Sequence, residues 1–248
     1  MKNKIYKFTE LINETLIEQM KKNKNIVCFG LGIDDPKRIF GTTKNLKEIF
    51  GSTRVFDTPA SENAMTGIGI GMSLNGLRPI MMHQRMDFFL LAMDQLINNA
   101  AKWKFMFGGK ETVPIVIRLI IGRGWGQGPT HSQNFQNLFA NIPGLKVYVP
   151  SFPSTARDLL IDAIKSPEPV IIIEHRWLHN IKEKVRQTKK NLKNINKLKN
   201  GKDITIVSSS YSTIEIAKIY KHLKENKISF DHLDINIIKP LITNKIYK

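Results

Sequence analysis

The sequence predicts an α/β fold in which a parallel sheet is covered by helices on both faces. Short runs of almost only apolar residues recur along the chain, and segments with apolar residues at helical spacing separate them. Strands that are apolar along their whole length, rather than at alternate positions, are typical of a parallel sheet buried on both sides. The predicted strands are Asn25–Gly30, Arg78–His83, Val113–Ile121, Leu145–Val149 and Val170–Glu174.

Three segments between these strands have the period of an α-helix. In the longest of them, Asp87–Phe107, apolar side chains recur at steps of three or four residues. These side chains belong to Phe88, Leu91, Ala92, Leu96, Ala100 and Trp103. We therefore expect one long helix here, with shorter helices over Ser61–Leu74 and Ser154–Ile164 and right-handed crossovers between the strands.

The composition is that of an ordinary globular protein, with 42% hydrophobic and 24% charged residues among 248. The single cysteine, Cys28, lies in an apolar run, so we expect a small buried side chain and no intramolecular disulfide, as in a reducing compartment.

Polar residues interrupt the first 20 residues at helical intervals, which predicts an amphipathic helix rather than a signal peptide. No run approaches the roughly 18 apolar residues that span a bilayer, so we expect a cytoplasmic protein without a membrane segment.

The net charge of +17 raises the question of nucleic-acid binding. Lys182–Lys202 contains nine Lys or Arg and one Glu, a net of +8, and has no aromatic side chain to stack on bases. We therefore expect a solvated basic linker over 181–202 and no nucleic-acid partner. A phosphate-binding arm is the alternative interpretation of this stretch.

A second, smaller unit follows the basic stretch. Its strand–helix–strand pattern predicts one βαβ unit over Asp203–Ser208, Ser212–Lys224 and Ile228–Ile235, and Asn236–Pro240 is expected to end it. A unit of this size buries little surface alone, so it must dock on the first domain or on a partner. The predicted division is a first domain over 1–180, the linker over 181–202 and a shortened second domain over 203–248.

A first concentration of chemical signals lies between Arg54 and Pro79. Ser61 is a plausible N-cap, and Glu62 then falls in the first helical turn, where the helix dipole favours a carboxylate. The three glycines at positions 67, 69 and 71 each cost about 1 kcal/mol relative to Ala in mid-helix, which predicts the close approach of a backbone or a ligand. An acid that only stabilises its own helix is the alternative interpretation of Glu62.

A second concentration is the glycine-rich loop from Gly122 to Gln133. It follows the strongest predicted strand, and open α/β sheets bind ligands at the carboxyl ends of their strands. The loop delivers His131 and lacks the Lys-Ser/Thr pair of a phosphate loop. His175 and His179 are spaced by four residues at a strand end, a weak signal for zinc. Neither G-x-S-x-G nor H-E-x-x-H is present, so hydrolases built on those motifs receive no support.

Together these segments resemble the β subunits of thiamine-diphosphate-dependent 2-oxoacid dehydrogenases, the E1 components for pyruvate, branched-chain 2-oxoacids and acetoin. The resemblance covers almost the whole chain and keeps the family's order and spacing. The matching stretches are FDTPASE (Phe56–Glu62), GLRP (Gly76–Pro79), DFF and MDQLINNAAK within Asp87–Lys102, THSQ (Thr130–Gln133), IPGLKVYVPS (Ile142–Ser151), PEPVIIIEHRWL (Pro167–Leu178) and DINIIKPL (Asp234–Leu241).

The resemblance implies a pyrimidine-binding domain of the transketolase type and an active site shared by two subunits. Thiamine diphosphate would place its aminopyrimidine end on this chain. Its diphosphate and Mg²⁺ would lie on an α subunit, whose GDG motif is absent here. By position, Glu62 would hydrogen-bond the pyrimidine N1′ and favour the imino tautomer, while Phe88 would pack against the ring. His131 would handle protons and contact the incoming lipoyl group.

The resemblance also implies partners and a further ion. An α subunit would complete an α2β2 assembly, and a lipoyl acyltransferase, the E2 component, would accept the acyl group. The family's potassium site would fall near Ile115, Ala163 and Glu168, where Ser166 replaces a common Asp.

The sequence departs from the family at three places. Leu31 stands where many relatives have an acidic residue, and Arg85 stands where they often have an aromatic or small one, which could alter the substrate pocket. The sequence ends at Lys248, soon after the Lys-Pro-Leu segment, whereas the family continues through the rest of a second domain. We therefore expect a shortened second domain without the usual region for subunit contacts and docking of E2.

From the resemblance we expect the aminopyrimidine half of a site for oxidative decarboxylation of a 2-oxoacid, with acyl transfer to lipoamide. A free-standing two-subunit thiamine-diphosphate enzyme of a biosynthetic pathway, with a non-lipoyl acceptor, is an alternative that suits the shortened second domain. A non-catalytic, truncated partner subunit is a further alternative, and the presence of Glu62, Phe88 and His131 argues against it.

Overall fold

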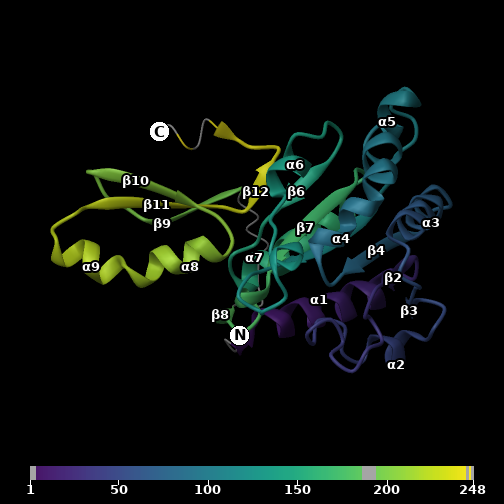
Figure 1. Ribbon diagram of the computed structural model, residues 1–248, viewed down its shortest axis with the longest axis horizontal. Coiled ribbons are helices and arrows are strands. Elements are labelled where there is room, and N and C mark those ends of the chain that lie inside the picture. Colours follow the sequence, from purple (N-terminus) through teal and green to yellow (C-terminus); the bar gives the residue numbers. More distant parts are fainter. Residues whose placement is uncertain (1–3, 186–193, 244–245, 247–248) are drawn as a thin grey trace.

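The computed structural model describes residues 4–185, 194–243 and 246. Its centre is a seven-stranded sheet in the order β12-β6-β7-β5-β4-β2-β3, in which all neighbouring pairs are parallel except β12 and β6 (Figure 1). The strands that the sequence predicted are β2 (Ile26–Gly30), β4 (Arg78–His83), β5 (Val116–Ile121), β6 (Lys146–Tyr148) and β7 (Val170–His175). The two edges are β3 (Val55–Asp57) and β12 (Ile237–Lys239).

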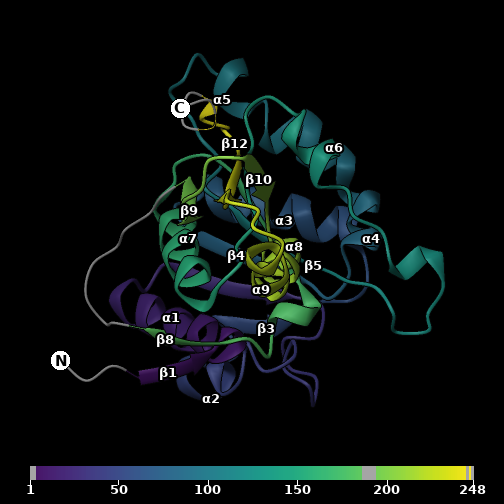
Figure 2. The same cartoon turned by 90° about the vertical axis from the view of Figure 1, so that its left-hand side faces the viewer.

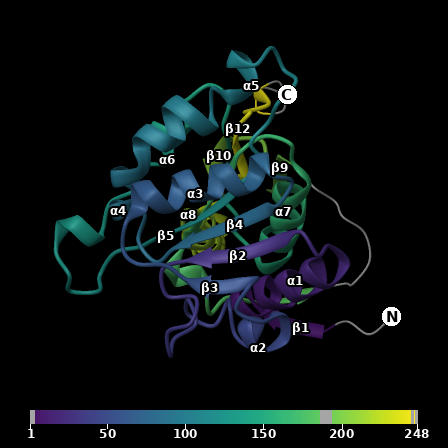
Figure 3. The ribbon, with the colours of Figure 1, turned by 90° about the vertical axis from the view of Figure 1, so that its right-hand side faces the viewer.

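Helices cover both faces of this sheet, as predicted. On one face lie α1 (Phe8–Lys22) and α7 (Pro153–Lys165). The other face carries α3 (Glu62–Leu74), α4 (Met86–Phe89) and α6 (Gln136–Ala140) (Figure 3). Each face has its own apolar core because successive residues of a strand point to opposite sides. In β2, for example, Cys28 lies in the core under α1 and Phe29 in the core under α3.

The amino-terminal helix α1 confirms the predicted amphipathic helix. Phe8, Ile12 and Leu16, spaced by four residues, are buried against the sheet. The preceding strand β1 (Lys4–Lys7) pairs antiparallel with β8 (Lys182–Val185). Figure 2 shows this pair near α2 (Leu46–Phe50), on the side of the molecule opposite β12. Within the described ranges, no helix has both the length and the apolar character needed to cross a membrane.

The prediction of one continuous helix over Asp87–Phe107 is wrong. The chain instead forms α4, a 3₁₀ turn η1 (Leu90–Ala92), a π-helical segment η2 (Gln95–Ala100) and α5 (Trp103–Met106). The predicted apolar face also fails at Leu91, which is 66% exposed. Neighbouring side chains on one face are about three residues apart in a 3₁₀-helix, three or four in an α-helix and four or five in a π-helix, so apolar steps of three or four do not distinguish these types.

The second domain is a three-stranded sheet with helices packed against it (Figure 1). Its strands β10 (Ile204–Ser208) and β11 (Phe230–Ile235) are parallel, which confirms the predicted βαβ unit. The single helix expected between them is divided into α8 (Tyr211–Lys218) and α9 (Tyr220–Glu225). The break is at Ile219, whose φ of −93° and ψ of 3° are not helical.

The stretch predicted as a basic linker, 181–202, contains strands in its described part. Besides β8, Ile195–Lys199 forms β9, which pairs antiparallel with β11; residues 186–193 lie outside the described residues. Lys197 Nζ is 2.8 Å from Asp231 Oδ1, and the Lys199 ammonium lies 4.9 Å from the centre of the Phe230 ring. Backbone pairing with β11 and these lysine contacts stabilise β9. Neither produces an apolar period in the sequence, so the strand was not predicted.

The last strand returns to the first sheet instead of ending the βαβ unit. β12 pairs antiparallel with β6, so residues expected to close the second domain extend the first. A buried carboxylate next to this crossing joins the two parts. Ser151 Oγ and Thr213 Oγ1 donate hydrogen bonds to Asp234 Oδ1 at 2.6 and 2.7 Å, and Asn236 Nδ2 donates to Asp234 Oδ2 at 2.9 Å. These bonds offset the cost of burying the Asp234 side chain.

The three glycines of α3 have different surroundings. A Cβ on Gly69 would lie 2.6 Å from Ile115 Cδ1 and 3.1 Å from Phe29 Cζ, so the predicted close approach comes from core side chains rather than from another backbone. At Gly71 a Cβ would have nothing within 4 Å. The helix is therefore tightly packed on one side and open on the other.

A buried ion pair crosses the centre of the sheet. Arg118 of β5 donates from Nε and Nη2 to the two carboxylate oxygens of Glu174 in β7 at 2.6 and 2.9 Å, and both side chains are buried. Burial by itself would raise the pKa of Glu174, but Arg118 and His179 outweigh it and hold the pKa at about 2. The Glu174 carboxylate is therefore ionised at neutral pH and fixes the bidentate pair.

We expect Glu174→Gln to lower the free energy of unfolding by about 3–5 kcal/mol, because it leaves the Arg118 charge buried without a counter-charge. Urea unfolding measures this loss. The matched control is Glu168→Gln, whose partly exposed carboxylate pairs with Lys104 and Lys146 and should cost about 0–1 kcal/mol. Equal losses in the two variants would contradict a structural role for the buried pair.

Candidate functional site

The residues predicted for the site follow the ends of three parallel strands. Glu62 begins α3, the helix after β3, and Phe88 lies in α4, directly after β4. His131 ends the 3₁₀ turn η3 (Pro129–His131) in the loop after β5. The carboxyl ends of parallel strands meet at one edge of the sheet, which is the usual ligand edge of α/β folds. The fold therefore brings these three segments to the same edge.

Glu62 is nearly buried, with 9% of its surface exposed. Among the described residues, its carboxylate has no hydrogen-bond or ion-pair partner, and its backbone oxygen accepts a hydrogen bond from Thr66 Oγ1 at 2.8 Å. The N-cap residue Ser61 makes no capping hydrogen bond. The Glu62 carboxylate is therefore left available to a ligand at this edge of the sheet.

Phe88 and His131 contact each other. Their ring centroids are 5.2 Å apart at an interplanar angle of 78°, an edge-to-face arrangement, and Phe88 remains 40% exposed. His131 Nδ1 lies 2.9 Å from the backbone oxygen of Gln127. A carbonyl oxygen can only accept, so the hydrogen of this bond is on Nδ1, and the neutral imidazole has its lone pair on Nε2. His131 can thus accept a proton at Nε2 beside an exposed aromatic ring.

The loop that carries His131 is tied to Arg85, a role that sequence reasoning missed. Arg85 Nη2 donates to Gln127 Oε1 at 2.9 Å, and the Arg85 guanidinium lies 4.3 Å from the centre of the Trp125 ring. Trp125 Nε1 in turn donates to the His131 backbone oxygen at 2.7 Å. The sequence singled out Arg85 as a departure from the family. The sequence did not indicate that Arg85 contacts Gln127 in the glycine-rich loop.

Asp87 adds a second tie to this loop. It is buried, and its Oδ1 accepts a hydrogen bond from the Gln133 backbone N–H at 3.1 Å. The loop backbone needs such ties because Gly124, Gly126 and Gly128 all have positive φ, between 68° and 75°, a conformation that glycine adopts without strain. Side chains of the segment after β4 therefore fix the position of the loop after β5.

Leu31, the other residue that departs from the family, has an apolar environment. Its side chain packs against the apolar core under α3, and its backbone N–H donates to the Met82 oxygen at 3.0 Å. An acidic side chain at this position would need a polar partner in apolar surroundings.

The predicted potassium site remains a prediction. The Ile115 and Ala163 carbonyl oxygens accept hydrogen bonds from backbone N–H groups. The Glu168 carboxylate lies 2.8 Å from Lys104 Nζ and 3.3 Å from Lys146 Nζ. Two ammonium groups already neutralise the Glu168 carboxylate. The oxygen atoms of Ile115, Ala163 and Glu168 therefore do not favour a further cation.

The two histidines at and after the end of β7 have separate surroundings. His175 stacks on Tyr211 with ring centroids 4.9 Å apart, and its Nδ1 accepts a hydrogen bond from the Trp177 backbone N–H at the start of η4 (Arg176–Leu178). His179 is buried, and its ring stacks on Phe8. Burial lowers the pKa of both imidazoles, to about 4 for His175. Among the described residues, neither histidine belongs to a group of three side chains that could bind a metal ion.

We expect Arg85→Ala to loosen the glycine-rich loop, because it removes the guanidinium that contacts both Gln127 and Trp125. Amide hydrogen exchange across residues 122–133 should accelerate by about tenfold, the loss of roughly one charge-assisted hydrogen bond. Lys110→Ala, at an exposed position before β5, is the control and should leave the exchange unchanged. Unaltered exchange in Arg85→Ala would show that the loop is held by other contacts.

Comparison with known proteins assigns the family. The family described as transketolase, pyrimidine binding domain, matches residues 5–181. The chain is 36% identical over 233 residues to the chloroplastic pyruvate dehydrogenase E1 component subunit beta-4 of Oryza sativa subsp. japonica, covering 93% of this chain and 58% of the relative. It is 32% identical over 235 residues to pyruvate dehydrogenase E1 component subunit beta of Staphylococcus epidermidis, covering 94% and 72%.

The chain thus spans less than two thirds of the length of the plant relatives, and about three quarters of the bacterial one. A solved structure described as a split gene transketolase, inactive β4 tetramer, has the same fold, with a TM-score of 0.78 at 21% identity over 97% of this chain and 74% of that one. By the match over residues 5–181 and the identity to the bacterial subunit, the chain belongs to the family of thiamine-diphosphate-dependent E1 β subunits that carry a transketolase pyrimidine-binding domain.

Proposed function

We propose that this chain forms the aminopyrimidine half of a 2-oxoacid dehydrogenase active site, with Glu62 hydrogen-bonded to the pyrimidine N1′ of thiamine diphosphate. The observation that carries this proposal is Glu62, a nearly buried residue whose carboxylate has no partner among the described residues. It begins a helix at the sheet edge where Phe88 and His131 also lie. A partner subunit would bind the diphosphate and Mg²⁺.

The side chains would divide the work as follows. When bound, the cofactor supplies the electron sink for loss of CO₂ from the 2-oxoacid. Glu62 shares a proton with a ring nitrogen, which requires a carboxyl group held close to the ligand. The exposed part of Phe88 offers a flat apolar surface to the ring. His131 takes up or gives a proton at Nε2, because Nδ1 is committed to the Gln127 oxygen.

An exposed apolar surface supports the proposed α partner. Five large apolar side chains on the α3–α5 side of the molecule are between 47% and 89% exposed: Ile68, Leu91, Phe105, Met106 and Phe107. An apolar hollow of about 780 Å³ lies at α5, and Ala101, Phe105 and Gly144 line it. Large exposed apolar patches on soluble proteins commonly mark interfaces. We assign this patch to the α subunit.

The acceptor that we propose is lipoamide, carried by an E2 component. His131 at the loop after β5 would be the group on this chain that meets the incoming lipoyl arm. The alternative, a non-lipoyl acceptor, differs only in the second half-reaction, so the decarboxylation step tests the shared part of the proposal.

With the α partner present, we expect Glu62→Ala to lower thiamine-diphosphate-dependent decarboxylation of a 2-oxoacid by about a hundredfold or more, since proton sharing with the pyrimidine is lost. Glu62→Gln keeps a hydrogen bond but cannot share a proton, so it should retain binding and lose turnover. Release of CO₂ from pyruvate and from a branched-chain 2-oxoacid provides the measurement.

Glu111→Gln, an exposed carboxylate before β5, is the control and should have ordinary activity. Full activity in Glu62→Ala would refute the assignment of the site. Adding free lipoamide or a lipoyl domain to the unmodified complex then tests the acceptor, and turnover that ignores both would exclude lipoamide.

Phe105→Ser should weaken association with the α subunit by about tenfold or more, because Phe105 is the most exposed apolar side chain of the patch, at 89%. Analytical ultracentrifugation of the mixed subunits measures this change. Ile204→Ser removes an exposed apolar side chain from the second domain and serves as the control. Equal association by both variants would place the α interface elsewhere.

A further inference from the structure

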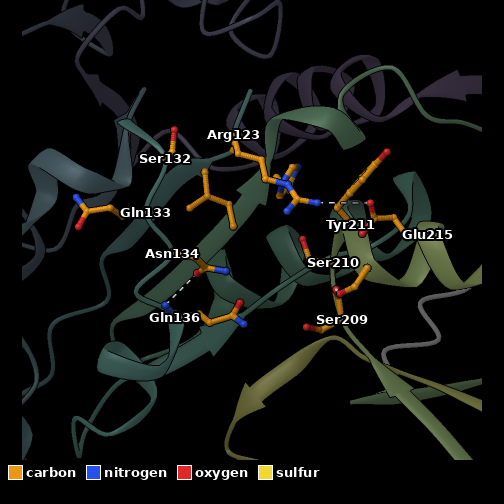
Figure 4. Close-up of a pocket in the computed structure, with 13 residues that line it drawn as sticks. Arg123, Ser132, Gln133, Asn134, Gln136, Ser209, Ser210, Tyr211 and Glu215 are labelled. Atoms are coloured by element: carbon orange, nitrogen blue, oxygen red, sulfur yellow. Dashed lines mark hydrogen bonds and ion pairs between the residues drawn. The ribbon is translucent and has the colours of Figure 1, made fainter. Parts of the chain in front are cut away.

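A second hollow lies between the two domains, apart from the Glu62 carboxylate. It has a volume of about 270 Å³ and is lined almost entirely by polar side chains (Figure 4). From the first domain, Arg123, Ser132 and Asn134 reach it from the loop after β5. Ser132 directly follows His131, so this pocket adjoins the same loop. The second domain supplies the opposite wall, at the start of α8.

The wall formed by the second domain has hydrogen-bond donors without partners. Ser210 is the N-cap of α8; it is 94% buried, and within the described residues its Oγ has no hydrogen-bond partner. Figure 4 shows this oxygen turned toward the side of the pocket where Arg123 lies. The N–H groups in the first turn of a helix have no acceptor inside the helix, and the helix dipole makes them favourable for an anion. Tyr211 and Ser212 of this turn also line the pocket.

Arg123 supplies a positive charge on the opposite wall. Its guanidinium lies 5.4 Å from the centre of the Trp177 ring, which supports it from behind. Its ion pair is with Glu215 of α8, and Nη2 and Oε1 are 3.7 Å apart (Figure 4). Both side chains are about half exposed, and pairs of this length at a surface contribute little. A ligand with its own negative charge can therefore replace Glu215.

The other ionisable group in the pocket is uncharged at neutral pH. Burial, with Arg123 nearby, lowers the pKa of His175 to about 4. Among the described residues that line the pocket, the charge therefore consists of one guanidinium and the displaceable Glu215 carboxylate. Apart from Ile121, the remaining lining side chains carry hydroxyl or amide groups, which suit a small polar molecule.

We propose that this pocket binds the oxyanion of a small molecule, a phosphoryl or carboxylate group, between the Arg123 guanidinium, the Ser210 hydroxyl and the first turn of α8. These donors come from both domains, so the site exists only where the second domain docks on the first. The inference does not depend on the role of Glu62, because binding by the full chain without an α subunit tests it.

Calorimetric titration of the full chain distinguishes the two sources of the oxyanion. Inorganic phosphate and pyruvate are the probes, and glycerol is the neutral control. Heat with phosphate alone would indicate a phosphoryl ligand, and heat with pyruvate that phosphate competes away would indicate a carboxylate. Both results support an oxyanion site. No heat with either probe, or equal heat with glycerol, would refute it.

Three variants identify the groups that bind. Arg123→Gln should weaken binding by about tenfold to a hundredfold, as expected for a lost charge-assisted hydrogen bond. Ser210→Gly removes the hydroxyl but keeps the fold, since φ at this position is 55°, and it should weaken binding by about threefold to tenfold. Glu215→Gln should tighten binding, because the competing carboxylate is gone.

Lys221→Ala, an exposed cation on α9 outside the pocket, is the control and should bind as the unchanged chain does. Circular dichroism and thermal unfolding verify that each variant is folded. Binding that is unaltered in both Arg123→Gln and Ser210→Gly, or that weakens in Glu215→Gln, would overturn the assignment.

Discussion

Parallel pairing of the central strands is the constraint on which the rest of the molecule depends. Because β3, β2, β4, β5 and β7 run in one direction, their carboxyl ends meet at one edge, and the segments that carry Glu62, Phe88 and His131 each follow one of those ends. The Arg118–Glu174 pair holds β5 and β7 together inside the sheet. His131 lies in the loop after β5 and His175 is the last residue of β7, so the buried pair also holds the strand ends from which these two histidines are presented.

The edge formed in this way leaves three groups available to a ligand or a partner. Within the part of the chain that the structure describes, the Glu62 carboxylate and His131 Nε2 have no hydrogen-bond partner, and the Phe88 ring is partly exposed. The open side of α3 and the exposed apolar side chains are consistent with a second subunit. Such a subunit would cover the apolar side chains and would complete the site at the start of α3.

Sequence reasoning succeeded where a local pattern determines the structure. The apolar strands, α3, α7 and the βαβ unit of the second domain were predictable, because each has its own apolar run or helical period. It failed where the cause lies elsewhere in the chain. The π-helical segment at Gln95–Ala100 shares its spacing with an α-helix, and β9 exists because β11 offers a free edge. No pattern within Ile237–Lys239 says which sheet it will join.

The site was predictable only in part. Local sequence left Glu62 with two interpretations, and the family resemblance chose between them. The hydrogen bond from Arg85 to Gln127, in the loop that carries His131, joins residues that are 42 positions apart in the sequence. No periodic pattern indicates such a contact. The pocket at Ser210 combines residues from both domains, so the run of hydroxyls from Ser208 to Thr213 was its one visible sign in the sequence.

The return of β12 to the first sheet has a consequence for self-association. Without it, β6 would be an edge strand with a row of unpaired backbone N–H and C=O groups, a template onto which a strand from another molecule could add. β12 covers that row with a strand of three residues whose pairing is irregular between Ile237 and Lys239. The new edge is too short and too uneven to recruit further strands. The second domain thus protects the sheet against aggregation through its last strand, whatever its other roles.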